Sequence, residues 1–264
     1  MRLLPRSVTS TAQGQRLRYS IMFFVFALAC VRLAFAIWDS VGWAVVLPLY
    51  IAFSFGLLAV AYAGFGPRLF LKRTTGRRSV LSWLIFAPYY LLNDLTFRVY
   101  RLLSREPAYV QVVPNLIFGR RLSAREAESL QCVSVLDLAA EFPATRWPQS
   151  KRVYRSLPVL DATAPTEDEL RSAAVWIADA IVSGPVYVHC ALGHGRSACV
   201  VIAYLLHAGA VNTVAEGARL LQSLRPGVRL HRQQRQLLRK FEAQSIRPVA
   251  EPDAHAAAEG RTVF

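Results

Sequence analysis

Cys190 and Arg196 are separated by five residues, and this pair carries the clearest chemical signal in the sequence. The apolar run Val186–His189 before the cysteine predicts a strand, and the apolar residues after the arginine predict a helix. A loop at a helix N-terminus directs backbone N–H groups at an anion. That place favours a thiolate, and an arginine fork holds two oxygens of an oxyanion. The spacing therefore predicts a nucleophilic sulfur and a guanidinium facing one small pocket.

The residues between this pair suit an anion-binding loop. Gly193 and Gly195 let the backbone curl without Cβ clashes, so that its amides point inward. The candidate phosphate-binding residues are Ala191, Leu192, Gly193, His194, Gly195 and Arg196. His194 is expected at the pocket mouth, where it either touches substrate or faces solvent. The alternative, a buried structural cysteine, leaves the glycines and the arginine unexplained.

Asp161 is the candidate general acid. Attack of a thiolate on a phosphate ester releases an oxyanion that needs a proton, so a carboxylic acid is expected nearby. Asp161 follows a predicted strand and precedes a loop, and the alternative is an aspartate that caps a turn. Asp137, at the end of the preceding predicted strand, is the rival. Glu167 and Asp168 are better explained as acids at the start of a helix.

The Cys190 loop resembles the Cys-x5-Arg loop of the protein tyrosine and dual-specificity phosphatases. The resemblance covers residues 114–243, including Asn115–Arg121, Asp161 and a closing segment with Arg225, Pro226, Gly227, Gln234, Leu238 and Phe241. It implies a phosphoric monoester hydrolase that forms a phosphocysteine intermediate. The catalytic residues implied are Cys190, Arg196, Asp161 and Ser197.

Two neighbours of the loop take roles from this resemblance. In the family the hydroxyl at the position of Ser197 stabilises the leaving thiolate, although a helix N-cap serine fits the same place. His189 takes a supporting role that orients the loop and tunes the thiol, although a lone strand histidine is more often a core residue. No metal or cofactor is expected, because Arg196 and the amides meet the phosphate charge.

The substrate class stays open between a phospholipid and the phosphotyrosine, phosphoserine or phosphothreonine of membrane-associated proteins. The branch that the chain most resembles includes the mitochondrial lipid phosphatase acting on phosphatidylglycerophosphate. The loop interior has no lysine, unlike tensin-like phosphoinositide phosphatases, which favours a single accessible phosphomonoester. A catalytically silent phosphate-binding adaptor is an alternative, but such proteins usually lose the cysteine or the arginine. A sulfur- or arsenate-handling enzyme with such a loop is disfavoured, because the Cys190 loop comes late in the sequence and because Asp161 is present.

The elements that position these residues are expected within residues 106–244, as an α/β sheet flanked by helices of the protein tyrosine phosphatase type. Strands are predicted at Tyr109–Val113, Leu116–Phe118, Cys132–Leu138, Val153–Val159 and Val186–His189. Helices are predicted at Ser123–Leu130, Thr166–Val182, Arg196–Ala208, Thr213–Leu224 and His231–Gln244. Residues 245–264 lack periodicity and are expected to form a disordered tail.

The preceding region predicts a membrane anchor. Residues 1–20 are expected as a basic N-terminal tail, and residues 21–66 as a transmembrane helical hairpin with spans at Ile21–Trp38 and Val41–Gly66. Residues 67–105 are expected as a basic juxtamembrane and interfacial segment. Within it, Val80–Leu92 is apolar but short and contains Pro88, which favours an interfacial or re-entrant helix. A crossing over residues 80–97 would instead place the catalytic domain outside.

Charge and cysteine usage indicate the location. Residues 1–105 carry 13 Lys or Arg against two acids, and residues 106–264 carry 18 against 15. The basic excess therefore lies beside the predicted spans, which excludes a basic nucleic-acid face on the catalytic domain. The four cysteines form no disulfide or zinc pattern, and a thiolate needs a reducing compartment. We expect an integral protein of the inner or plasma membrane with its catalytic domain on the cytoplasmic side.

Overall fold

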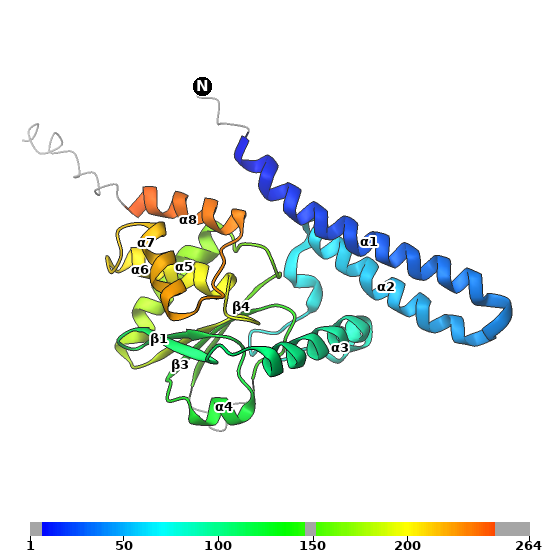
Figure 1. Cartoon of the computed structure of the whole chain (residues 1–264), viewed down its shortest axis with the longest axis horizontal. Helices are drawn as coiled ribbons and strands as arrows, with labels where there is room; N and C mark the ends of the chain where they lie inside the picture. Colours follow the sequence, from blue (N-terminus) through cyan, green and yellow to red (C-terminus); the bar gives the residue numbers. More distant parts are fainter. Residues whose placement is uncertain (1–6, 146–151, 246–264) are drawn as a thin grey trace, which may run out of the picture.

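A five-stranded sheet forms the centre of the α/β body in the computed structural model, which describes residues 7–145 and 152–245 (Figure 1). The strand order is β1-β2-β5-β3-β4, with β1 (Tyr109–Val113), β2 (Leu116–Gly119), β3 (Ser134–Ala139), β4 (Val153–Val159) and β5 (Val186–His189). β1 pairs antiparallel with β2, and the other neighbours pair parallel. The chain that leaves the carboxyl end of β5 therefore emerges at the middle of the edge where α/β folds bind ligands.

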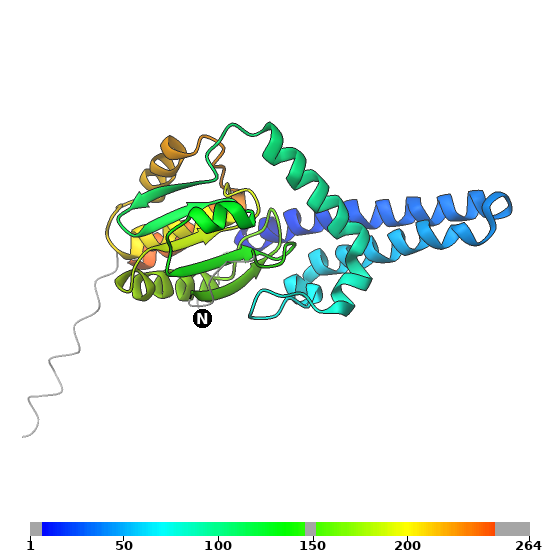
Figure 2. The same cartoon turned by 90° about the horizontal axis from the view of Figure 1, so that it is seen from below.

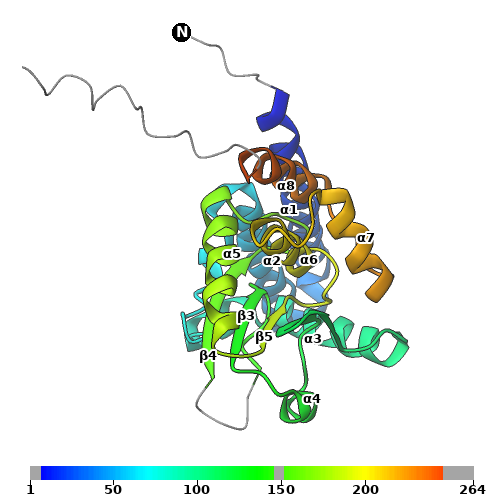
Figure 3. The ribbon, with the colours of Figure 1, turned by 90° about the vertical axis from the view of Figure 1, so that its left-hand side faces the viewer.

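Five helices accompany the sheet: α4 (Ala124–Ser129), α5 (Glu167–Val182), α6 (Arg196–His207), α7 (Val214–Leu224) and α8 (Arg232–Ser245). α4 lies on one side of the sheet, and α5 to α8 lie on the other (Figures 1 and 3). α6 is buried from Arg196 to Leu206, so the helix after the loop is part of the core. The expected α/β architecture is confirmed, and the predicted strands and helices match the observed bounds within two residues.

Two long helices, α1 (Ser7–Val41) and α2 (Val46–Val60), pack side by side and project from the α/β body (Figures 1 and 2). A 3-10 turn, η1 (Gly42–Val45), joins them, and the short turns η2 (Ala61–Phe65) and η3 (Gly66–Phe70) follow. The helical run Gly14–Phe70 is long and apolar enough to cross a membrane by length and composition. Because the run reverses at η1, it forms a helical hairpin, and large side chains such as Phe35 and Trp43 are exposed along it.

The basic N-terminal segment is not a separate tail, because α1 begins at Ser7 and continues into the apolar run. Each residue added to an existing helix gains a hydrogen bond, and no proline interrupts this one. Ser20 Oγ donates to the Ala59 carbonyl at 2.9 Å, and the rings of Tyr19 and Tyr62 lie 5.5 Å apart. Residues 1–6, and the tail predicted after Ser245, lie outside the described residues.

Helix α3 (Val80–Leu103) crosses between the hairpin and the α/β body (Figure 2). The short interfacial helix and the basic segment predicted after it are one continuous helix. Pro88 does not break it, although proline lacks the N–H that would bond the carbonyl of Leu84. The hydroxyl of Tyr50, on α2, donates to that carbonyl instead. The helix therefore passes through its proline because the hairpin satisfies the orphaned acceptor.

Two basic side chains between the hairpin and α3 contact the α/β body. Lys72 Nζ lies 2.8 Å from Asp137 Oδ2, and both side chains are almost fully buried. Arg78 donates to the backbone carbonyl of Glu141, and its guanidinium lies 3.4 Å from the ring centre of Tyr90. Buried charges are stable only when they are paired, so these contacts fix the segment to the end of β3.

Candidate active site

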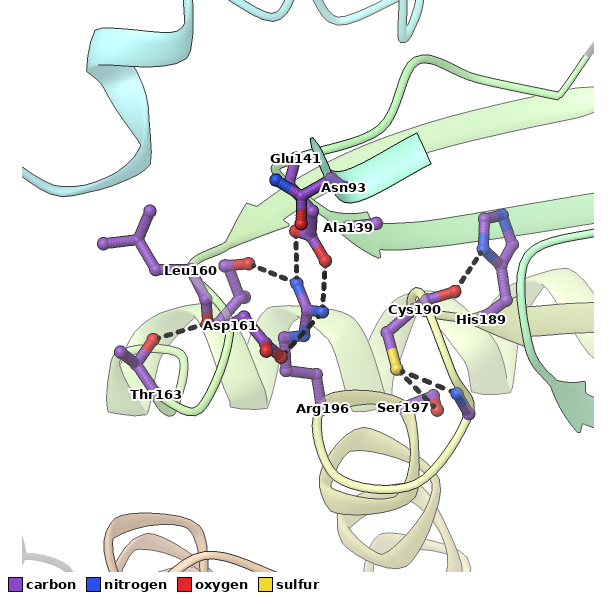
Figure 4. Close-up of polar contacts among 12 residues, drawn as sticks. Asn93, Ala139, Glu141, Leu160, Asp161, Thr163, His189, Cys190, Arg196 and Ser197 are labelled. Carbon is purple, nitrogen blue, oxygen red and sulfur yellow. Dashed lines mark hydrogen bonds and ion pairs between the residues drawn. The ribbon is translucent and has the colours of Figure 1, made fainter. Parts of the chain in front are cut away.

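The Cys190 side chain lies inside the loop that connects β5 to α6 (Figure 4). Its Sγ accepts a hydrogen bond from the Gly193 amide at 3.3 Å and lies 3.4 Å from Ser197 Oγ. The φ angle of Gly193 is +77°, and a Cβ there would lie 2.5 Å from the carbonyl carbon of Gly119. Glycine alone satisfies both the angle and the space. The structure thus brings the thiol, Ser197 and the curled loop together at the N-terminus of α6.

Arg196 is the first residue of α6, and its guanidinium is held by two carboxylates (Figure 4). Nη1 and Nη2 donate to Glu141 at 2.7 and 2.5 Å, and Nη1 also donates to the Val159 carbonyl at 2.8 Å. Nη2 lies 3.0 Å from Asp161 Oδ1. Burial disfavours the charged form, but Glu141 and Asp161 outweigh it and raise the pKa of Arg196 well above its usual range. The guanidinium is therefore a fixed cation beside the loop.

Glu141 is a site residue that the sequence analysis missed. It follows β3, its side chain is buried, and it forms a two-bond ion pair with Arg196. A bidentate pair of this kind sets the orientation of an arginine as well as its charge. The available signal was a carboxylate within the apolar run from Leu138 to Phe142, because a buried glutamate almost always has a charged partner.

Asp161 reaches the same site from the loop after β4. Its side chain is 67% exposed, in contrast to the buried pair that Arg196 makes with Glu141. Ala162 follows with φ of +55°, and the Thr163 hydroxyl donates to the Leu160 carbonyl at 2.9 Å. Asp161 is therefore a carboxylate on a tight turn, with one contact to the cation and access to solvent.

Asp137, the rival candidate for the acid, is enclosed by hydrogen-bond donors. Besides Lys72, its carboxylate accepts hydrogen bonds from the Tyr154 hydroxyl at 2.7 Å and the Ala139 amide at 2.9 Å. Burial raises the pKa of Asp137, but the charge and hydrogen bond of Lys72 outweigh it and hold the pKa below its usual range. A buried carboxylate that stays ionised is a structural anchor and a poor proton donor. Glu167 and Asp168 lie in the first turn of α5, as predicted.

His189 is buried beneath the loop. Its Nδ1 lies 3.2 Å from the Cys190 carbonyl oxygen and 3.9 Å from Asp137 Oδ1, and its ring stacks on Tyr187 with ring centres 5.3 Å apart. Burial lowers the pKa of His189 against the opposing effect of Asp137, which favours a neutral ring. The placement allows this ring to orient the start of the loop.

His194 is neither free in solvent nor directed at the thiol, since its Nε2 lies 2.6 Å from Glu106 Oε2. Arg225 Nη2 donates to the same carboxylate at 3.1 Å and to the Leu192 carbonyl at 3.1 Å. Burial raises the pKa of Glu106, but His194 and the Gly227 amide outweigh it and lower the pKa. These contacts brace the outer side of the loop. Glu106 was missed because it lies outside the local motif.

A small pocket of about 160 Å³ opens beside the loop, and helix α3 forms one of its walls. The α3 side chains that line it are Asn93, Thr96, Phe97 and Tyr100. The α/β body contributes Glu141, Phe142, Asp161, Ala191 and Leu192. The segment that precedes the catalytic region in sequence is therefore part of the site.

Within residues 7–145 and 152–245, no cluster of three or more His, Cys, Asp or Glu side chains is arranged to hold a metal ion. All four cysteines lie in this described part and are free thiols. Of the backbone amides in the Cys190 loop, that of Gly193 donates to Cys190 Sγ, and Arg196 begins the helix that follows the loop.

Comparison with known proteins agrees with this geometry. Residues 120–244 match the family model of the dual specificity phosphatase catalytic domain. The phosphatidylglycerophosphate phosphatase PTPMT2 of Arabidopsis thaliana is 40% identical over 63 residues, which are 24% of this chain and 27% of that relative. The chain therefore matches about a quarter of the length of that curated relative.

Several solved phosphatase structures are similar to about half of the chain. The crystal structure of Tk-PTP in its active form is 23% identical, with 52% of this chain and 98% of that chain covered and a TM-score of 0.46. The structure of PTPMT1 in complex with PI(5)P is 18% identical, with 53% and 97% covered and a TM-score of 0.48. Residues 120–244 are therefore similar to a dual specificity phosphatase catalytic domain.

Proposed function

We propose that this protein is a phosphatase, that its helical hairpin anchors it in a membrane, and that it hydrolyses the terminal phosphomonoester of a lipid at the bilayer surface. The proposal rests mainly on the two faces of helix α3. One face of α3 lines the pocket beside the Cys190 loop, and the opposite face exposes apolar side chains. The pocket and an apolar surface thus share one helix, as expected for an enzyme that takes its substrate from lipid.

The exposed side chains of α3 follow helical spacing. The exposed apolar residues are Val80, Leu81, Trp83, Leu84, Leu91, Leu92, Leu95, Val99, Leu102 and Leu103. Contiguous exposed apolar side chains mark surfaces that bind a partner or a membrane. The apolar hairpin continues from this face of α3, so one layer of lipid accounts for both surfaces. The basic residues of the first 105 positions support an orientation with the catalytic domain on the cytoplasmic side.

The proposed chemistry proceeds in two steps. The Cys190 thiolate attacks phosphorus, a sulfur–phosphorus bond forms, and the bond to the leaving oxygen breaks with its electron pair. The leaving oxygen takes the proton of the Asp161 carboxyl group. In the second step Asp161 removes a proton from water, and the oxygen of that water attacks phosphorus. The sulfur–phosphorus bond breaks with its electron pair, which restores the Cys190 thiolate beside the Ser197 hydroxyl. The products are the lipid alcohol and inorganic phosphate.

The ion pair between Arg196 and Asp161 gives substrate binding a specific consequence. A phosphate dianion in the loop competes for the same guanidinium, and it carries more charge than one exposed carboxylate. Glu141 keeps its two buried bonds to Arg196 while Asp161 is displaced. Substrate binding therefore frees the Asp161 carboxylate, which is 67% exposed and takes up a proton from solvent before it protonates the leaving oxygen.

The relatives support a lipid substrate with one accessible phosphomonoester. PTPMT2 of Arabidopsis is a phosphatidylglycerophosphate phosphatase, and the Cys190 loop of this chain contains no lysine to meet further phosphates. A phosphoprotein substrate is the alternative outcome of the experiment below.

The test compares substrate classes with the full-length protein in mixed micelles. Phosphate release is measured from phosphatidic acid, from phosphatidylglycerophosphate and from phosphotyrosine and phosphoserine peptides. We expect the highest kcat/KM with a lipid phosphomonoester and no turnover by Cys190→Ser. A higher kcat/KM with a phosphopeptide than with either lipid would overturn the lipid proposal in favour of protein substrates. Turnover by Cys190→Ser would refute the phosphocysteine mechanism.

A second experiment tests the α3 surface. Leu102 on α3 and Val182 on α5 are 85% and 87% exposed, so each is replaced by glutamate in turn. Burial of one leucine in lipid contributes about 1.5–3 kcal/mol, which corresponds to about tenfold or more in turnover of vesicle-bound lipid. We expect that loss for Leu102→Glu and not for Val182→Glu, with aryl phosphate turnover unchanged in both. Equal effects of the two variants would count against α3 as the lipid-facing surface.

A further inference from the structure

The turn that carries Asp161 is held from two opposite sides. On the side of the α/β body, Gln234 Nε2, on α8, donates to the Thr163 carbonyl at 2.8 Å. On the other side, the hairpin supplies both donors. The Tyr62 hydroxyl donates to the Asp161 carbonyl at 3.1 Å, and Gln15 Nε2 donates to the Ala162 carbonyl at 3.2 Å.

The hairpin contacts reach a part of the chain that needs support. Ala162 adopts φ of +55°, a left-handed conformation that costs free energy for a residue with a Cβ. Leu160, directly before Asp161, is buried in an apolar cluster that includes Tyr62 of the hairpin and Phe86 of α3. The anchor thus contributes both apolar packing and hydrogen bonds to the conformation of this turn.

Tyr62 is itself held rigidly. Its side chain is 3% exposed, and its ring lies 5.5 Å from Tyr19 and 5.4 Å from Phe23 between centres. It stands in the π-helical turn η2, and single π turns inside helices are frequent at functional sites. The packing of α1 against η2 therefore determines where the hydroxyl points.

We infer that the base of the hairpin positions the general acid, with Tyr62 and Gln15 as positioning residues that act through the backbone of Asp161 and Ala162. The inference rests on the proposed role of Asp161. It makes the membrane anchor part of the machinery for proton transfer, in addition to its role in attachment. Neither residue touches substrate, so its effect must appear in the leaving-group dependence of the rate.

The experiment uses the full-length protein in detergent with two substrates. A nitrophenyl phosphate releases a stable phenoxide that needs no protonation, whereas an alkyl phosphate monoester releases an alkoxide that does. Asp161→Asn is the reference and should lower the alkyl-to-aryl rate ratio most. Tyr62→Phe removes one hydrogen bond, and we expect the same ratio to fall about five- to tenfold. Gln15→Leu should act in the same direction.

Tyr50→Phe is the matched control, because it also removes a bond from a tyrosine hydroxyl to a backbone carbonyl, here between α2 and Leu84 of α3 and not at the turn that carries Asp161. We expect an unchanged ratio. The positioning role would be overturned if the alkyl-to-aryl rate ratio falls for Asp161→Asn but not for Tyr62→Phe or Gln15→Leu. Equal loss with both substrates in Tyr62→Phe would indicate a merely structural residue. An unchanged ratio in Asp161→Asn would instead refute the acid role itself.

Discussion

Replacement of Glu141 by glutamine isolates the charge of one carboxylate while its size is kept. Glu141 and Arg196 are both buried and share two short hydrogen bonds. Removal of one partner of a buried ion pair costs about 3–5 kcal/mol of stability. Arg196 keeps its bonds to the Val159 carbonyl and to Asp161, so we expect the lower end of that range.

The catalytic effect of Glu141→Gln has a separate cause. Asp161 becomes the sole carboxylate on Arg196, so the acid is held more tightly on the cation when substrate must replace it. Loss of a correctly aimed cation or donor typically costs about 10²–10³ in kcat. We expect a decrease of about 10² in kcat/KM with nitrophenyl phosphate, together with a lower unfolding temperature. Steady-state kinetics and thermal unfolding of the full-length protein in detergent measure both quantities.

Glu126→Gln is the matched control. Glu126 also forms an ion pair with an arginine, Arg120 at 2.7 Å, but it is partly exposed and its ion pairs are with Arg101 and Arg120 and not with Arg196. Burial disfavours its ionised form, whereas the hydrogen bonds from Arg120 and Ser123 outweigh it and lower the pKa of Glu126 to about 2. Its loss should leave kcat/KM within about twofold, because exposed pairs contribute about 0–1 kcal/mol. Equal activity of Glu141→Gln and wild type would refute the reasoning about Arg196.

Three further predictions concern stability and the loop. Lys72→Met leaves Asp137 ionised and unpaired in the core, so we expect about 3–5 kcal/mol less stability in denaturant titrations, largely restored by a second change, Asp137→Asn. No restoration in the double variant would contradict the pairing. The pKa of Glu126 is lower in the folded state than its ordinary 4.5, so its contribution is complete above about pH 4.5 and is lost as pH falls toward 2. Between about pH 4.5 and 2, the unfolding temperature of Glu126→Gln should depend less steeply on pH than that of the wild type. An unchanged dependence would show that this carboxylate does not contribute to the acid sensitivity. Gly193→Ala places a Cβ against backbone, and we expect at least about 10²-fold lower kcat, while near-normal activity would show that the loop tolerates rearrangement.

Much of the α/β body could be predicted from the sequence because its signals are local. Alternating apolar runs and capping residues fixed most strand and helix ends within two residues, and Ser123 and Thr166 begin helices as expected. The Cys190 loop could be recognised because its glycines, thiol and arginine are contiguous. For the same reason the sequence predicted a helical hairpin before the catalytic region, although it placed the start of the first helix too late.

Other features depend on contacts that no local pattern records. α3 was predicted as a short surface helix because Pro88 should interrupt it, and the donor that rescues its acceptor comes from Tyr50 on another helix. His194 was expected to face substrate or solvent, and it is instead bound by Glu106 from a distant segment. Periodicity describes which residues are apolar, and it does not determine which polar groups meet.

The amino-acid order alone determined the Cys190 loop, the sheet that presents it and the apolar hairpin, because each depends on neighbours along the chain. Only the tertiary structure decided which groups complete the site. Glu141 and Arg196 lie 55 residues apart, Lys72 and Asp137 lie 65 apart, and Tyr62 and Asp161 lie 99 apart. Such pairs form because a charged or polar group that is buried on folding loses its hydrogen bonds to water. It then needs a partner within the protein, and that partner can lie far away in the sequence.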